Sequence, residues 1–181
     1  MKLSEIVEIK VGLPLSRKRG GEFEYKLLTL KCFDGRGIYL KNEKCLEKFT
    51  SNKKVDDYLA RCGDVVIRLR EPIKAVYIEK EVLVPSTMAI LRANKDVNMK
   101  FLAYYLNTKK VQKTLHKNIE GSYVKMIGIR DIKEIDINLP PKNIQNKVVE
   151  VLDLQEKELS LYEDLIKQKE LLKEAILRSI V

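Results

Sequence analysis

The chain has 181 residues, of which 45% are hydrophobic, so its composition suits one globular domain with a proper core and one extension. Residues 1–10 lack the apolar core of a signal peptide and no apolar run reaches membrane length, so we expect an intracellular, cytoplasmic protein. Three widely spaced cysteines without a CxxC pair, and a single histidine, argue against a zinc site, and an odd number of cysteines is typical of a reducing compartment.

Short strands are predicted in the first half of the chain. The expected strands are residues 7–11, 25–30, 65–69, 75–78 and 88–91. In the second of these, Leu27, Leu28 and Leu30 are expected to be buried. Asp34 and Gly35 predict a tight turn with residues 38–40 as the returning strand, and the lysine-rich residues 41–59 are expected to form a loop and a short helix.

Helical periodicity dominates the following stretch. Residues 99–107 and residues 109–117 are predicted helices, each with one apolar face. A last short strand that contains Ile135 and Ile137 then leads to Pro140 and Pro141. The order of elements predicts a mixed α+β globular domain over residues 1–141.

A long helical arm is predicted after the two prolines, which form a stiff, extended hinge. Residues 144–180 contain neither Gly nor Pro, and their apolar side chains recur at helical spacing. Such a helix is about 55 Å long, too long to lie wholly against the domain. We therefore expect residues 142–181 to project and to pair with another helix in an antiparallel coiled coil. A shorter helix that folds back on its own domain is the alternative.

The charge is unevenly distributed along the chain, whose formal net charge is +9. Residues 144–181 carry 6 Lys and Arg against 8 Asp and Glu, whereas the remaining residues carry 29 against 18. A basic domain with a slightly acidic arm indicates that the domain binds a polyanion and that the arm binds protein. The alternative is a lysine-rich surface without such a partner.

Catalytic motifs are absent from the sequence. The only imidazole, His116, lies among lysines with no Ser or Cys motif near it, and no glycine-rich phosphate loop is present. The prolines follow Leu139 and precede Lys142, so the Asn-Pro-Pro-aromatic motif of amino-group DNA methyltransferases is also missing. These observations indicate a non-catalytic binding protein without a metal or cofactor of its own.

Several short pieces follow one another in a specific order. They are the strand before Gly12; Gly63 and Asp64 before residues 65–69; Val84, Pro85 and Ser86 before residues 88–91; FLAYYLN at 101–107 followed by Gln112 and Leu115; Gly121 and Ser122 before Ile127 and Ile132; and Leu139, Pro140 and Pro141 followed by Gln145, Val148, Val149 and Leu152. Together they resemble the specificity subunit of Type I restriction–modification systems, in a half-size form with one target-recognition domain and one conserved helical region.

This resemblance implies that the domain reads a short sequence of double-stranded DNA and that the helix is a spacer and docking arm. DNA methyltransferase (modification) subunits, separate polypeptides that carry S-adenosylmethionine, are the implied partners, and a restriction subunit is a further candidate. The usual family member has two recognition domains, whereas this chain has one. A homodimer with antiparallel arms, which reads a palindromic bipartite target, is the expected solution. A fragment, or pairing with a different half-subunit, is the alternative.

The candidate DNA contacts are basic or flexible. We expect the basic loop and two lysines on a helix to contact phosphates, and the loop at 121–125 together with two arginines to read base edges. The phosphate candidates are Arg17, Lys18, Arg19, Lys113 and Lys117, and the reading candidates are Arg68, Arg70, Gly121, Ser122, Tyr123 and Lys125.

The candidate dimer contacts are the apolar positions of the arm. Gln155 and Lys169 interrupt this stripe and are candidates for setting the helix register. The expected interface residues are Val148, Leu152, Leu159, Tyr162, Ile166, Leu172 and Ile176. Two other functions stay open: a protein-interaction adaptor with an acidic partner, and an RNA-binding module. The second is disfavoured by the absence of Trp and of an aromatic-rich strand.

Overall fold

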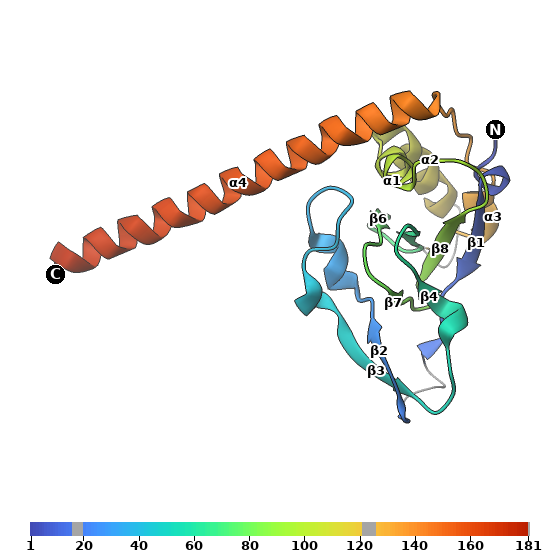
Figure 1. Cartoon of the computed structure of the whole chain (residues 1–181), viewed down its shortest axis with the longest axis horizontal. Coiled ribbons are helices and arrows are strands. Elements are labelled where there is room, and N and C mark those ends of the chain that lie inside the picture. Colours follow the sequence, from blue (N-terminus) through green and yellow to red (C-terminus); the bar gives the residue numbers. More distant parts are fainter. Residues whose placement is uncertain (16–19, 121–125, 181) are drawn as a thin grey trace.

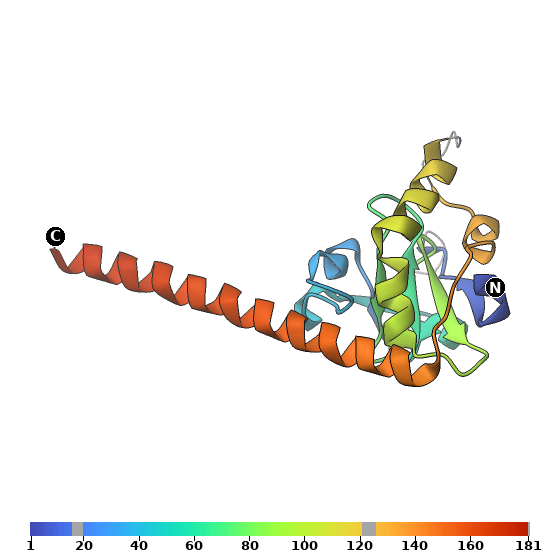
Figure 2. The same cartoon turned by 90° about the horizontal axis from the view of Figure 1, so that it is seen from above.

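The computed structural model describes residues 1–15, 20–120 and 126–180, and it consists of a head, residues 1–141, and an arm. The described part of the head contains two four-stranded sheets and three short α-helices. The arm is one helix, α4 (Lys142–Ile180), which runs along one side of the head and then projects beyond it (Figures 1 and 2). The predicted fold class, a mixed α and β domain with a long C-terminal helix, is confirmed. The division into a domain of residues 1–141 and an arm of residues 142–181, and the pairing of arms, stay predictions.

An antiparallel sheet of order β1-β8-β5-β6 forms the centre of the head. Its strands are β1 (Val7–Val11), β8 (Met88–Ala93), β5 (Val65–Arg68) and β6 (Ala75–Tyr77). Strand β5 is buried along its whole length because both faces of the sheet are covered. Val65 and Ile67 point into one apolar cluster and Val66 points into another. The continuous apolar run that predicts this strand therefore reflects burial on two sides.

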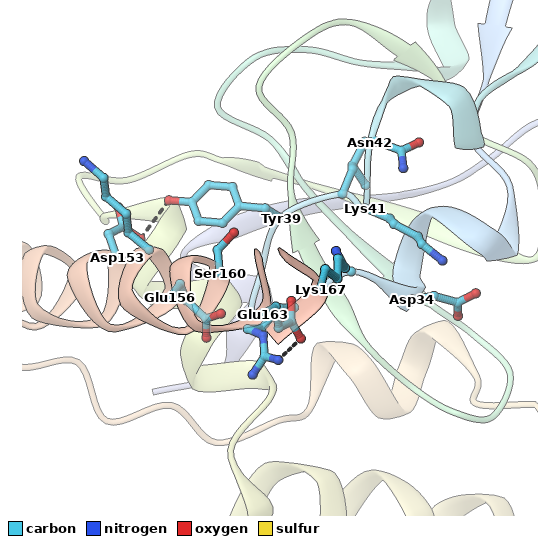
Figure 3. A pocket seen from close by; sticks show the side chains of 13 residues that line it. Asp34, Tyr39, Lys41, Asn42, Asp153, Glu156, Ser160, Glu163 and Lys167 are labelled. Atoms are coloured by element: carbon cyan, nitrogen blue, oxygen red, sulfur yellow. Dashed lines mark hydrogen bonds and ion pairs between the residues drawn. The ribbon is translucent and has the colours of Figure 1, made fainter. Parts of the chain in front are cut away.

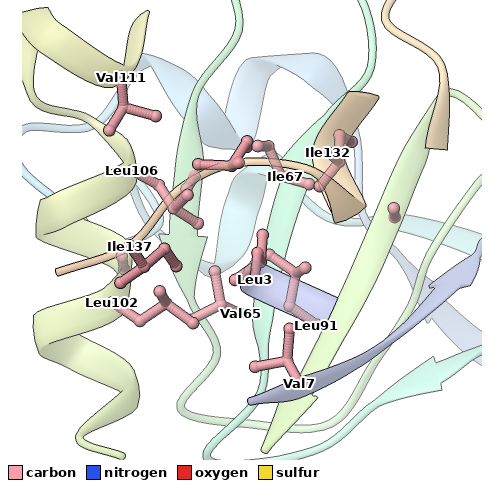
Figure 4. Packing of buried hydrophobic residues seen from close by; sticks show 14 of the residues in the cluster. Leu3, Val7, Val65, Ile67, Leu91, Leu102, Leu106, Val111, Ile132 and Ile137 are labelled. Atoms are coloured by element: carbon pink, nitrogen blue, oxygen red, sulfur yellow. The ribbon is translucent and has the colours of Figure 1, made fainter. Parts of the chain in front are cut away.

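Three helices cover one face of this sheet: α1 (Met99–Leu106), α2 (Lys109–Glu120) and α3 (Ile129–Lys133). Asn98 caps α1, because its side-chain oxygen accepts hydrogen bonds from the backbone N–H groups of residues 100 and 101. Leu102 and Leu106 are fully buried and point toward Val65 and Leu91 of the sheet (Figure 4). Complete burial of a leucine side chain contributes roughly 1.5–3 kcal/mol, so this layer is the main core of the head.

The end of α1 is tied to the edge of the sheet by Asn107. Its Oδ1 accepts a hydrogen bond from the backbone N of Ala75 at 2.9 Å, and its Nδ2 donates to the backbone O of Ala75 at 2.8 Å. The amide thus pairs with the free edge of β6 as a neighbouring strand would. The asparagine that ends the FLAYYLN segment therefore orients α1 against the sheet.

A second, smaller sheet of order β3-β2-β7-β4 packs below the first. Its strands are β3 (Glu47–Ser51), β2 (Phe23–Leu27), β7 (Val82–Leu83) and β4 (Leu59–Ala60). The described part of the head also contains the short 3₁₀ helices η1 (Leu3–Glu5), η3 (Leu30–Asp34), η4 (Glu43–Cys45) and η5 (Asp56–Tyr58). Strands β2 and β3 form an antiparallel ribbon, and β2 pairs with β7 in parallel through Leu27 and Leu83. Leu27, Leu83 and Phe49 share a third apolar cluster under this sheet.

Gly12 lies where the two sheets meet. Leu13 donates its backbone N–H to the O of Val84 at 2.7 Å and accepts from the N of Ser86 at 2.8 Å. A Cβ atom on Gly12 would lie 2.3 Å from the backbone O of Pro85, which is closer than atoms can approach. Two of the pieces that carry the family resemblance, Gly12 and the residues 84–86, are therefore one contact between two chain segments.

Asp64 fixes the turn between β4 and β5. Its carboxylate is only 4% exposed and accepts two hydrogen bonds from Arg92 of β8, at 3.0 Å from Nε and 2.6 Å from a terminal guanidinium nitrogen. It also accepts the backbone N–H of Arg61 at 2.8 Å. A bidentate arginine–carboxylate pair of this kind holds both partners in one geometry. The Gly63–Asp64 piece thus stabilises the turn.

Two cysteines are paired, which differs from the expectation of a reducing compartment. Cys32 and Cys45 form a disulfide with their Cα atoms 5.0 Å apart, whereas Cys62 is free and exposed. Disulfides are typical of oxidising environments, so the number of cysteines alone does not support the predicted compartment. The pairing joins η3 to η4, two segments whose proximity no local pattern indicates.

Four sequence predictions in the head are wrong or only partly right. Residues 38–40 form no strand, because residues 30–34 are a 3₁₀ helix and not one arm of a hairpin. The strand predicted at 25–30 is β2, which ends at Leu27, and Leu30 is 50% exposed. Residues 41–59 contain the short helical turns η4 and η5, but also the strand β3, in which Phe49 is the one apolar side chain. Near Ile135 and Ile137 there is only an isolated bridge between Lys2 and Asp136.

The arm begins directly after the proline pair, two residues before the stretch that predicts it. Its 39 residues correspond to about 58 Å of helix. The helices predicted at 99–107 and 109–117 are likewise confirmed as α1 and α2. Of the helices in the described ranges, none combines the length and the apolar character needed to cross a membrane.

The close approach at Gly12 leads to a stability prediction. We expect Gly12→Ala to lower the free energy of unfolding by roughly 2–4 kcal/mol, because the Cβ must displace the backbone at residues 84 and 85. Urea denaturation followed by circular dichroism measures this change. Gly128→Ala is the matched control, since its Cβ would meet a movable carboxylate oxygen of Asp131 at 3.0 Å. Equal effects of about 1 kcal/mol or less for both variants would contradict the prediction.

Candidate functional site

Most of the predicted DNA contacts lie outside the described residues. These are Arg17, Lys18, Arg19, Gly121, Ser122, Tyr123 and Lys125. Their flanking residues are placed. Gly20 forms a parallel bridge with Ser51 at the end of β3, and Met126 forms an antiparallel bridge with Arg70. The two predicted loops therefore join the head at two different places, one beside the β2–β3 ribbon and one beside the end of β5.

Arg68 is not available for reading bases. The residue is 7% exposed, a terminal guanidinium nitrogen donates to the backbone O of Glu71 at 3.1 Å, and the guanidinium lies 5.7 Å from the centre of the Phe33 ring. Burial lowers the pKa of this guanidinium, and the nearby charge of Asp34 only partly opposes that effect. Held inside the head, Arg68 cannot reach a base edge. It is a packing residue, and its assignment to the DNA surface is withdrawn.

Arg70, Lys113 and Lys117 do lie on the surface and belong to one region of the head. All three are exposed, and the two lysines lie one turn apart on α2. His116, between them on the same helix, contacts Glu71 with 2.8 Å between its Nδ1 and Oε1. This contact brings the segment after β5 against the second half of α2. We call Arg70, Lys113 and Lys117 the α2 surface.

A second basic position is not among the predicted contacts. Lys53 and Lys54 are exposed in the segment that follows β3, and Lys54 Nζ lies 6.0 Å from the centre of the Phe23 ring. The bridge between Gly20 and Ser51 places the end of the predicted basic loop beside these lysines. In the sequence, the polar run from residue 51 to residue 54 is the local pattern that indicates this turn. It follows strand β3, which the pattern of apolar residues does not predict.

The junction of head and arm is built around Asp153 of α4. Its Oδ1 accepts hydrogen bonds from the hydroxyl groups of Tyr39 at 2.7 Å and Tyr104 at 2.9 Å, and its Oδ2 accepts from Lys100 Nζ at 3.1 Å (Figure 3 shows the bond from Tyr39). Lys100 Nζ also lies 5.1 Å from the centre of the Tyr39 ring and 5.4 Å from that of Tyr77. We call Tyr39, Lys100, Tyr104 and Asp153 the junction cluster.

The protonation states in the junction cluster follow from its contacts. Burial would raise the pKa of Asp153, but the hydrogen bonds from Tyr39, Lys100 and Tyr104 lower it overall. Burial would lower the pKa of Lys100, but its contacts with Tyr39 and Asp153 raise it overall. Burial and the neighbouring carboxylate raise the pKa of Tyr39 to about 12, and that of Tyr104 also rises. At neutral pH the cluster is therefore one carboxylate with three protonated donors.

Polar contacts on both sides extend this junction. Toward the start of the arm, Gln145 is 3% exposed, accepts the backbone N–H of Asn98 at 2.9 Å and donates to the backbone O of Pro140 at 2.8 Å. Further along the arm, Arg36 forms an ion pair with Glu163 (Figure 3). These contacts connect the arm to the head from its first turn to its sixth.

A polar cleft of about 790 Å³ lies between α4 and the segment after η3. Asp34 and Lys41 approach it from the head, and Glu156, Ser160 and Lys167 approach it from the arm (Figure 3). Both signs of charge line the cleft, and its described lining contains no Cys, His or glycine-rich phosphate loop. In the ranges that the structure covers, no cluster of three or more His, Cys, Asp or Glu has a geometry that could hold a metal ion.

The predicted interface residues of the arm are mostly exposed. Leu159, Tyr162 and Ile166 are 41%, 54% and 57% exposed. Val148, Leu172 and Ile176 are also exposed, as are further apolar side chains, namely Val151, Leu154, Leu161, Leu165, Leu171 and Leu177. Leu152 differs, because it is half-buried and lines a hollow on its own head together with Phe33 and Ile38. Leu152 therefore packs against its own head, and the prediction that it belongs to the dimer interface is wrong.

Both the sequence and the fold of this chain are similar to those of known proteins. Residues 1–171 match the family model described as the Type I restriction modification DNA specificity domain. No curated protein matches the chain. Solved structures do: the HsdS subunit from Thermoanaerobacter tengcongensis has a TM-score of 0.64 at 22% sequence identity, covering 89% of this chain and 37% of that one.

Two further structures are similar. A structure reported for complex assembly and conformational transition of the type I R-M system has a TM-score of 0.62 at 21% identity, covering 90% of this chain and 39% of that one. The type I restriction–modification S subunit from M. genitalium has a TM-score of 0.58 at 17% identity, covering 91% and 40%. At these identities the likeness establishes the fold. The chain spans between 37% and 40% of the length of these three proteins.

The charges of the junction cluster predict a pH-dependent stability. Because the pKa of Asp153 is lowered by folding, this carboxylate stabilises the fold at pH values above its unfolded pKa of about 3.9, and the stabilisation is lost as the pH falls through its folded pKa. Because the pKa of Lys100 is raised by folding, this ammonium group stabilises the fold at pH values below its unfolded pKa of about 10.5, and the stabilisation is lost at higher pH. We expect Asp153→Asn to cost about 1–3 kcal/mol near pH 7 and progressively less below pH of about 4. Denaturation at several pH values measures this.

Glu158→Gln is the control for this prediction, because among the described residues that carboxylate accepts a hydrogen bond only from Tyr162 of the same exposed helix, at 3.0 Å. Its cost is expected to stay below about 0.5 kcal/mol at every pH. A difference between Asp153→Asn and the wild type that is the same at pH 7 and at pH 3 contradicts the assigned charges.

Proposed function

Because this chain belongs to the family of Type I restriction–modification DNA specificity domains, we propose that it is the DNA-recognition subunit of such a system, a cytoplasmic protein whose head reads one half-site. The observation that carries the proposal is that the family match runs from residue 1 to residue 171, so it includes the head and most of the arm. The match thus covers both parts that the proposal uses, a head to read a half-site and an arm to act as spacer.

Specificity subunits of this family recognise DNA and are not catalytic. The chemistry belongs, in this proposal, to a separate DNA methyltransferase (modification) subunit that carries S-adenosylmethionine and docks on the arm. A restriction subunit is a further partner. The surplus of acidic over basic side chains in residues 144–181 and the surplus of basic ones elsewhere support this division, because DNA attracts the head and not the arm.

The α2 surface is the proposed phosphate contact. Lys113 and Lys117 are exposed on one face of a helix, and Arg70 lies beside the same helix. A helix of this size fits the major groove of B-form DNA, and so does a two-stranded ribbon such as β2–β3 with Lys53 and Lys54 at its end. The predicted reading loop, Gly121–Lys125, directly follows α2 along the chain. This continuity favours α2 as the element that positions the reading loop.

A second head is supplied, in this proposal, by a second copy of the chain. One head alone reads one half-site, and this chain spans only 37–40% of the length of the similar S subunits. The part of α4 beyond residue 163 carries exposed Leu and Ile side chains that its own head does not cover. A contiguous apolar stripe of this kind marks a contact surface, and a second α4 in the opposite direction presents a matching one.

The α2 surface predicts a specific change in salt dependence. We expect Lys113→Gln with Lys117→Gln to weaken binding to all duplex sequences alike, and to reduce the slope of log affinity against log salt by about 1–2, because each lost phosphate contact removes about 0.9. Fluorescence anisotropy at three salt concentrations measures the slope. Lys167→Gln with Lys173→Gln removes the same charge from the arm and serves as control. Identical slopes for the two double variants would show that α2 does not contact phosphates.

The exposed stripe predicts the oligomeric state. We expect the wild type to sediment as a dimer at micromolar concentration and Leu159→Glu with Ile166→Glu to sediment as a monomer, because each new carboxylate is buried without a partner in a paired arm. Gln168→Glu with Arg178→Glu, which changes exposed polar positions away from this stripe on the same helix, is the control and is expected to stay dimeric. A monomeric wild type removes the claim.

A further inference from the structure

The arm is attached to the head along a long line and not at a single point. Head contacts reach from Gln145 in the first turn, through Asp153, to Glu163. At 1.5 Å per residue this line extends over about 27 Å, and about 25 Å of helix continue beyond it. The direction of the free part is therefore set by how the attached part lies on the head.

The contacts along this line differ in their strength. Arg36 and Glu163 are 43% and 50% exposed, and ion pairs with such exposure contribute little. Gln145 is buried, but it lies next to the proline pair, where the helix pivots. Lys100 and Asp153 are 30% and 29% exposed, and they hold charge-assisted hydrogen bonds eight residues further along the helix. The junction cluster is thus the strongest polar contact that acts at a distance from the pivot.

The geometry of the junction cluster restricts rotation as well as tilt. The carboxylate of Asp153 accepts donors from two segments of the head: Tyr39 from the segment between η3 and η4, and Lys100 and Tyr104 from successive turns of α1. Turning α4 about its own axis moves the carboxylate away from Tyr39 or from α1. Tilting α4 lengthens the bonds on one side. All three bonds persist together only in one placement of the arm.

A small change in the tilt of α4 on the head becomes a large displacement at the far end of the arm. From Gln145 to the end of α4 the helix measures about 52 Å, so a tilt of about 4° moves the tip by roughly 3.4 Å, which is one base step of DNA. A dimer that requires one fixed gap between its half-sites must therefore hold the arm within a few degrees of one direction.

We propose that Tyr39, Lys100, Tyr104 and Asp153 are positioning residues that determine the gap between the two half-sites of the target, while the residues that read bases lie elsewhere. This inference rests on the proposed function, since a gap exists only if two heads share one DNA. Specificity then has two separable parts: the head reads sequence, and the junction cluster sets the distance between the two readings.

The first test measures the arm directly. In a Cys62→Ser background, Lys53→Cys and Gln168→Cys place one spin label on the head and one on the projecting arm, both at exposed positions. Dilution with an excess of unlabelled chain leaves only distances within one chain. We expect a narrow distance distribution for the wild type, and for Asp153→Asn a roughly tenfold larger population outside the main peak. Glu158→Gln is expected to match the wild type. If Asp153→Asn and Tyr39→Phe both keep the narrow distribution, the inference is overturned.

The second test measures the gap. Duplexes are selected from a random pool by the full chain and sequenced. The wild type is expected to select two inverted half-sites at one gap length, whereas Asp153→Asn selects the same half-sites at several gap lengths. A single unchanged gap for a variant whose arm distribution has broadened overturns the inference. Selection of no paired half-sites by the wild type defeats the proposed function itself, and the spin-label result distinguishes that failure from a junction that does not hold the arm.

Discussion

One carboxylate, Asp153, determines how this molecule is put together. It lies on the arm, its hydrogen-bond donors lie on the head, and the charges of the group are balanced at neutral pH. Without these bonds the arm would be held to the head by Gln145 near the proline pair, by the half-buried Leu152 and by the exposed Arg36–Glu163 pair, which restrict its direction less. With them, the rod extends from the head in a defined direction (Figures 1 and 2). The proposed function, in which two reading heads stand at a fixed distance, requires this attachment to be rigid.

The head and the arm meet opposite physical demands. The head buries its apolar side chains around a central antiparallel sheet and presents basic side chains outward, which suits contact with a polyanion. The arm buries little of its apolar surface, because beyond residue 163 it has no head to pack against. An exposed apolar stripe is costly for an isolated chain and useful for an assembling one. The proposed function uses the same helix as spacer and as contact surface.

Much of this architecture follows from local sequence patterns, and the rest depends on contacts between distant residues. The absence of Gly and Pro after residue 141 predicts α4, and the apolar run at residues 65–69 predicts β5. Strand β3 escapes prediction because Phe49 is its one apolar side chain and its other buried side chain is the polar Ser51. Tyr39 and Asp153 are separated by 114 residues, and no periodicity connects them. The sequence indicates that Arg68 is a surface cation, because its packing against Phe33 depends on a segment distant in the chain.

The central claim is that a rigid rod holds two heads apart, and small-angle X-ray scattering of the wild-type chain in solution tests it most directly. The account predicts a particle of twice the chain mass of 21.0 kDa, with two maxima in its pair-distance distribution, one from distances within each head and one from distances between heads. A particle with the mass of one chain, or a dimer with a single compact maximum, would contradict it.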